Sequence, residues 1–182
     1  MRKYSKMVAG VLCALALTFA ITANAATAAA PVTSTSLYNA GEVGLSLSSG
    51  YVVDRAAAFQ QDYSFNLTAG LFYFPYRNFG VEVNLPFYQS KGVSVSEVEV
   101  GLLARLPLSE KATFWKNLAP FAGLGVVYNW NAAENVAYEA KVGLEYRLNS
   151  KWGVAVDGRY RNNDFDWNHG STTVNVSLHL VF

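Results

Sequence analysis

The chain has 182 residues, of which 52% are hydrophobic, 14% aromatic and 15% charged. Its 14 basic and 13 acidic residues nearly cancel, so no basic excess points to a nucleic-acid partner. The single cysteine, Cys13, lies in an apolar stretch near the N-terminus, and a disulfide within the chain is therefore excluded.

The N-terminal residues have the pattern of a cleaved export signal. Three basic residues precede an apolar run at 7–20, and the small-x-small string Ala23-Asn24-Ala25 follows it. The run is shorter than the roughly 20 residues of a membrane-spanning helix. We predict a signal peptide at 1–25, with a second possible cleavage site at 28–30. Residues 26–40 are small, polar and unpatterned, and we expect a flexible lead there.

Eight segments after the lead alternate between apolar and polar residues, as the two faces of a β-strand require. In chain order, we predict strands at 41–51, 63–74, 79–88, 97–108, 118–130, 136–148, 152–161 and 173–182. The connection at 75–78 is a tight turn by its proline and asparagine. Val93 and Val95 have the opposite parity from the strand that follows, which predicts a bulge or a loop end near Ser96.

One face of every predicted strand is apolar and carries no charge, whereas the opposite face carries charges and glycines. The charged positions on the polar faces are Glu42, Glu82, Glu97, Glu99, Arg105, Glu139, Lys141, Glu145, Arg147, Asp157, Arg159 and Arg161. The glycines among them are Gly44, Gly70, Gly80, Gly101, Gly123, Gly125 and Gly143. Such alternation fits either a soluble lipocalin-like barrel with the apolar face inside or a membrane barrel with that face outside.

Three features favour the membrane barrel. Glycine makes room beside charged side chains in a narrow lumen but has no evident use on a wetted surface. Apolar-face aromatics cluster near both strand ends, as membrane interfaces favour. The sequence closes on Phe182, and no run of 18 apolar residues follows the signal. We therefore predict an all-β fold at 41–182, an eight-stranded antiparallel up-and-down transmembrane β-barrel.

The signal, the eight alternating segments and the aromatic last residue resemble the small OmpA/OmpX-type and opacity-protein-like barrels of bacterial outer membranes. The most family-like strings are PFAGLGVVYNW at 120–130 and VGLEYRLNSKWGVAVDGRYR at 142–161. The resemblance implies an outer-membrane location and contact with membrane lipids and lipopolysaccharide. It also implies that Phe182 is part of the signal read by the barrel-assembly machinery. Without a periplasmic module or long loops, peptidoglycan anchoring and receptor binding are not implied.

An even number of strands puts both ends of the chain on one side of the barrel, and we expect a monomer with that side in the periplasm. The connections expected to face outward are 52–61, 89–96, 131–135 and 162–171. Those expected to face the periplasm are 75–78, 109–117 and 149–151.

The candidate functional site is the set of charges that point into the lumen. Glu145 and Arg147 are spaced by two on one face, so they stack along the lumen. We expect one network of Glu82, Glu99, Arg105, Glu139, Lys141, Glu145, Arg147, Asp157, Arg159 and Arg161. An eight-stranded barrel is just wide enough for side chains to fill, so a salt-bridged plug is the first interpretation. A narrow porin conducting ions or small solutes along the same residues is the alternative.

Enzymatic and metal-binding interpretations have less support. Some small outer-membrane barrels modify lipid A with a histidine, but His169 lacks the His-x-Ser-Asn string of the deacylases, and His179 is placed inward. A metal site from Asp164, Asp166 and His169 is the other possibility, although such residues are common in turns. We predict no catalytic, cofactor or metal site. We expect a non-enzymatic structural or surface protein, with a lipid A-modifying enzyme as the least favoured class.

Overall fold

A computed structural model describes residues 37–55, 66–90, 93–108, 115–129, 136–162 and 170–182. The predicted signal peptide at 1–25 and most of the predicted lead lie outside the described residues. So do Asp164, Asp166 and His169, the three residues of the possible metal site.

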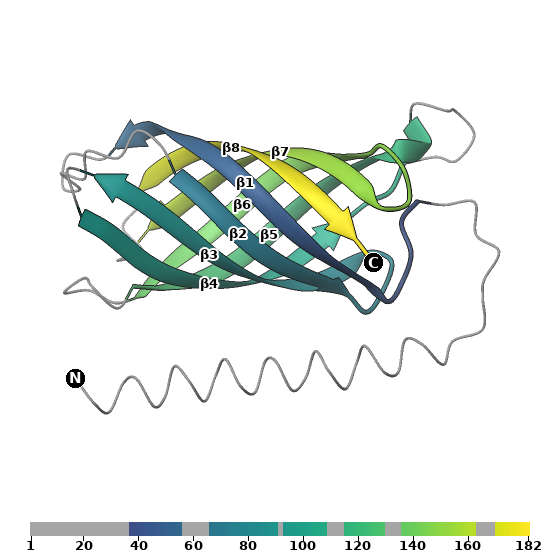
Figure 1. Cartoon of the computed structure of the whole chain (residues 1–182), viewed down its shortest axis with the longest axis horizontal. Helices are drawn as coiled ribbons and strands as arrows, with labels where there is room; N and C mark the ends of the chain where they lie inside the picture. The colour runs from purple at the N-terminus through teal and green to yellow at the C-terminus, as the bar shows by residue number, and fades with distance from the viewer. Residues whose placement is uncertain (1–36, 56–65, 91–92, 109–114, 130–135, 163–169) are drawn as a thin grey trace. The chain divides into compact units, whose positions relative to one another are not determined.

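The described residues form one closed barrel of eight antiparallel strands (Figure 1). The strands are β1 Glu42–Arg55, β2 Asn66–Phe74, β3 Phe79–Ser90, β4 Val93–Arg105, β5 Leu118–Asn129, β6 Val136–Arg147, β7 Trp152–Asn162 and β8 Ser171–Val181, with a short 3-10 helix η1 at Trp115–Asn117. Each strand pairs with its neighbours in sequence, and β1 pairs with β8 to close the wall. The predicted fold class is confirmed. Within the described ranges, no helix is long and apolar enough to span a bilayer.

The barrel has two rims, a near rim and a far rim. The near rim is where β1 begins and β8 ends, and it carries the connections 75–78, 106–117 and 148–151. At the far rim β1, β3, β5 and β7 end and β2, β4, β6 and β8 begin. The strand ends are thus divided between the two rims as the sequence predicts.

The bulge or loop end predicted near Ser96 is wrong. β4 begins before that residue, and its pairing with β3 keeps one register on both sides of it, from Asn84↔Glu99 to Ser90↔Val93. The irregularity lies instead in β1, where the register against β8 shifts between Val52 and Asp54. A change of parity in the sequence near a strand end therefore does not by itself require an extra residue in the ladder.

The apolar faces of the strands point away from the lumen. Leu102, Leu124 and Val142 are each about two-thirds exposed, at 67%, 69% and 66%. Exposed aromatics lie towards the near rim at Phe79, Trp152 and Phe182 and towards the far rim at Tyr51, Phe87 and Tyr138. This arrangement is the reverse of a lipocalin, whose apolar side chains fill the interior, and it matches a wall that faces lipid.

A small apolar cluster inside the barrel was not expected from the sequence. The cluster is buried close to the near rim and consists of Phe72, Phe74, Leu103 and Val181, with Phe121 packed against them. The two β2 phenylalanines have the parity of the polar face, so the alternation that predicts the wall also puts them inside.

The inward glycines leave room for larger neighbours, as their place among the charges suggests. A β-carbon at Gly143 would lie 2.6 Å from the Phe121 ring and 2.8 Å from the β-carbon of Asp157. A β-carbon at Gly123 would lie 2.8 Å from the ε-carbon of Lys141. At Gly143 an added β-carbon would also lie 2.5 Å from the backbone oxygen of Val156, so a larger residue there must displace its neighbours.

The substitution Gly143→Ala tests this packing. We expect it to lower the free energy of unfolding by about 1–3 kcal/mol, the usual cost of overpacking. The measurement is urea unfolding in lipid vesicles, followed by the loss of the heat-modifiable folded band on a gel. The matched control is Gly158→Ala on β7, where an added β-carbon meets nothing within 4 Å. Equal stabilities for the two variants would contradict a tightly filled lumen.

Candidate functional site

The structure places all ten residues of the predicted network inside the barrel. Eight are buried: Glu82, Glu99, Arg105, Glu139, Lys141, Glu145, Arg147 and Asp157. The side chains of Arg159 and Arg161, nearer the far rim, are still only 12% and 18% exposed. Strand alternation is what aims them, since each occupies the parity of the polar face.

Two arginines and two glutamates form a cluster at the near rim. Glu42 Oε2 forms ion pairs with both arginines, at 2.7 Å from Arg105 Nη1 and 3.1 Å from Arg147 Nη2. Arg147 Nε lies 2.6 Å from Glu145 Oε1, which is also 3.1 Å from His179 Nδ1. Glu42 begins β1 while Arg105 ends β4, so this ion pair crosses the lumen rather than following the wall.

Tyr38 completes the near-rim cluster, although it precedes the first strand. Its ring packs against both guanidinium groups, with the ζ-carbons of Arg105 and Arg147 each 5.0 Å from the ring centroid. Its hydroxyl donates to the backbone oxygens of Asn117 and Glu145, at 2.7 and 3.1 Å. Burial raises the pKa of the Tyr38 hydroxyl above its ordinary value, so this group remains a donor. The expected flexible lead at 26–40 is thus wrong at Tyr38, which is fully buried.

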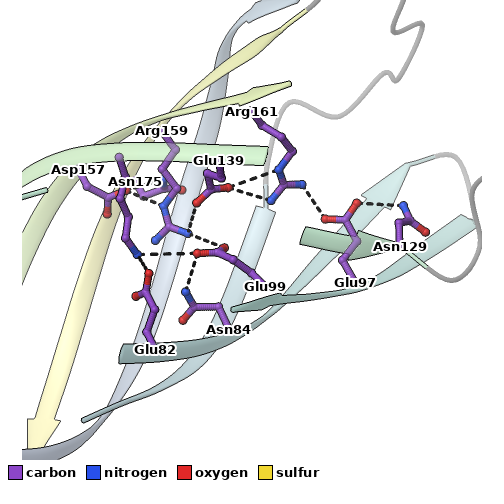
Figure 2. A network of polar contacts seen from close by, with 11 residues as sticks. Glu82, Asn84, Glu97, Glu99, Asn129, Glu139, Asp157, Arg159, Arg161 and Asn175 are labelled. Carbon is purple, nitrogen blue, oxygen red and sulfur yellow. Dashed lines mark hydrogen bonds and ion pairs between the residues drawn. The ribbon is translucent and has the colours of Figure 1, made fainter. Parts of the chain in front are cut away.

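A second cluster fills the middle of the lumen around Arg159 (Figure 2). Arg159 Nη1 lies 3.3 Å from Glu99 Oε2 and 3.6 Å from Glu139 Oε1, and its Nε donates to Asp157 Oδ1 at 2.6 Å. Lys141 pairs with Glu82 on β3 and lies 3.8 Å from Glu99 Oε1. One guanidinium therefore joins carboxylates of β4, β6 and β7.

Arg161 forms a third level, closer to the far rim. Its Nη1 lies 2.6 Å from Glu97 Oε2, and its Nη2 lies 3.0 Å from Glu139 Oε2 (Figure 2). The amide of Asn129 donates to the other oxygen of Glu97 at 2.9 Å. Glu42 and Glu97 thus belong to the network although only their polar-face position was evident from the sequence. Their arginine partners lie on strands that are not neighbours of their own, which alternation cannot show.

A cavity lies between the near-rim and middle clusters. Arg105 and Glu145 line it on one side, Lys141 and Arg159 on the other, and Phe121 contributes an apolar wall. About 40 Å³ is accessible to the centre of a water molecule, which is room for only a few ordered waters. Among the described residues no group of His, Cys, Asp or Glu side chains is arranged to hold a metal ion.

No protein-family model matches the sequence, and no curated protein matches it significantly. Solved structures do resemble it. A de novo designed transmembrane β-barrel is 18% identical, covers 79% of this chain and 98% of its own, and has a TM-score of 0.59. The N-terminal β-barrel domain of Pseudomonas aeruginosa OprF is 10% identical, with the same coverage and TM-score. The outer membrane enzyme PagL is 11% identical, covers 75% of this chain and 98% of its own, and has a TM-score of 0.51.

The chain has the fold of a small transmembrane β-barrel. Sequence identities this low show the fold alone. The function of the transmembrane barrel therefore has to be inferred from the side chains in its own lumen. That lumen holds ion pairs at three levels, which we call the near-rim, middle and far-rim levels.

Removing one partner at the near-rim level should destabilise the transmembrane barrel. Arg147→Ala leaves Glu42 and Glu145 short of a buried cation, and we expect a loss of about 3–5 kcal/mol in the free energy of unfolding. Urea unfolding in lipid vesicles measures it. The control, Lys151→Ala in the exposed 148–151 turn, should change stability by less than about 0.5 kcal/mol. Similar losses in both variants would show that the near-rim ion pairs contribute nothing.

Proposed function

We propose that the chain is a non-enzymatic outer-membrane protein with a structural or surface role and a lumen closed by ion pairs. The observation that carries this proposal is that ion pairs cross the lumen at all three levels. Arg105 of β4 meets Glu42 of β1, Lys141 of β6 meets Glu82 of β3, and Arg161 of β7 meets Glu97 of β4. Each pair joins strands three apart in an eight-stranded wall, so it spans the interior.

The outer-membrane location is supported by the outward apolar faces, the two aromatic bands and the predicted export signal. In this location the wall contacts membrane lipids and lipopolysaccharide, with the near rim in the periplasm and the protein a monomer. Phe182 is 73% exposed, and its backbone nitrogen donates to Val43 at 2.9 Å. This accessible ring is consistent with the expected role of Phe182 as a signal for the barrel-assembly machinery.

The enzymatic alternative, a lipid A-modifying protein, is supported by the fold shared with the outer membrane enzyme PagL and by the contact between His179 and Glu145. That contact lies inside the lumen, beside the small cavity. A lipid acyl chain in the surrounding bilayer cannot reach it without crossing the wall. We therefore infer a non-enzymatic role.

Single-channel current distinguishes the closed lumen from the porin alternative. In a planar bilayer the purified protein should show no discrete conductance, because three levels of ion pairs lie in series. Arg159→Ala alone should also stay silent, since the near-rim and far-rim levels remain. The control is a protein-free addition of the same detergent.

Discrete steps in the unmodified protein that change with Arg147→Ala or Arg159→Ala would overturn the proposal in favour of a porin. Such a pore should prefer cations. The middle and far-rim levels hold three cations (Lys141, Arg159, Arg161) against five carboxylates (Glu82, Glu97, Glu99, Glu139, Asp157).

A further inference from the structure

The segment that carries Tyr38 reaches the lumen without being part of the barrel wall. It comes before β1, and the chain bends between them at Gly41, whose φ is 83°. Only glycine adopts this backbone conformation without strain. The Gly41 nitrogen donates to the oxygen of Phe74 at 2.7 Å, so the bend is attached to the wall while Tyr38 points inward.

Side chains rather than strand pairing hold the segment in place. The Asn39 nitrogen donates to Glu42 Oε1 at 2.6 Å, and the Asn39 oxygen accepts from Arg105 Nη2 at 3.1 Å. The Nη1 atom of Arg147 has no hydrogen-bond partner among the described residues. Its guanidinium faces the Tyr38 ring, where the negative face of the π-system stabilises it.

Tyr38 packs at the near rim against residues of the cavity lining. Arg105 and Glu145 contact Tyr38 and also line the cavity. We infer that residues 38–40 are a detachable plug hinged at Gly41, with an aromatic side chain that packs against two arginines and separates the cavity from the near rim. This inference rests on the proposed closed lumen and names the element that closes one end of it.

The plug can leave without breaking the barrel. The ladder between β1 and β8 begins at Gly44↔Val181, beyond the Gly41 bend. Arg105 and Arg147 keep their ion pairs to Glu42 and Glu145 when the ring is gone, so no buried charge loses its partner. What is lost is a pair of cation–π contacts and a few hydrogen bonds, which makes opening a local event.

The reactivity of a cysteine in the cavity tests the plug. Ser177 is buried in the cavity lining, and Ser177→Cys is nearly isosteric. The probe is 2-aminoethyl methanethiosulfonate, with modification of the purified protein followed by mass spectrometry. The protein without the new cysteine serves as the blank, since Cys13 lies in the predicted signal peptide.

With Tyr38 in place, the cysteine at 177 should react slowly. Adding Tyr38→Ala should raise its rate at least about tenfold, because the ring no longer packs over Arg105 and Glu145 of the cavity lining. Tyr38→Phe keeps the ring against the guanidinium groups and should stay within about threefold of the unmodified rate, whereas Tyr38→Leu should not. The Phe and Leu variants keep the test valid if Tyr38→Ala fails to fold.

Two controls distinguish an opened mouth from a loosened barrel. Tyr51→Ala removes an exposed tyrosine from the outer face of β1 and should leave the rate unchanged. A cysteine in place of the buried Val127, towards the far end of β5, should not respond to Tyr38→Ala.

Equal rates at 177 for Tyr38→Ala and Tyr51→Ala would overturn the plug, as would equal acceleration at positions 127 and 177. Neither outcome affects the proposed closed lumen if the unmodified protein remains silent in the planar bilayer. Conductance in the unmodified protein would instead refute the closed lumen itself.

Discussion

A charge that points into an eight-stranded barrel must find its partner there, because the lumen is filled by side chains and excludes bulk water. The interior of this protein follows from that constraint. Its arginines and lysine pair with carboxylates of several strands, as Arg159 of β7 does with Glu99 of β4 and Glu139 of β6. Glycines such as Gly143 leave the space that these long side chains occupy. The outer wall is then free to be apolar throughout, and the same alternation serves both faces.

Much of this could be predicted from the sequence, because a strand has a period of two. Glu145 and Arg147 had to share a face, and the absence of charge on the opposite face identified the lipid-facing side. Cross-lumen partners could not be predicted in this way. The pairing of Glu42 with Arg105 depends on how the strands are staggered around the closed wall, and adjacent-strand patterns contain no information about groups three strands apart.

Tyr38 shows a second limit of sequence reasoning. It lies outside any alternating segment, so nothing local distinguishes it from the small polar residues around it. Its position becomes meaningful only once Arg105 and Arg147 are brought together at the near rim. The sequence feature that could have indicated the inward position of Tyr38 is the Gly41-Glu42 pair. A glycine that permits a sharp bend there precedes the carboxylate that holds the bend. Together these residues make one end of the lumen depend on a segment that does not contribute to the wall.

Ion pairs and Tyr38 close the lumen in this account of the protein. Water is the most sensitive probe of that closure because it is the smallest solute that an open lumen would pass. The direct measurement is osmotic water permeability of lipid vesicles containing the protein, followed by light scattering after rapid mixing with a hypertonic buffer. Vesicles with and without the protein should shrink at the same rate, because no continuous water column connects the two rims. A permeability that rises in proportion to the amount of folded protein would contradict a closed lumen.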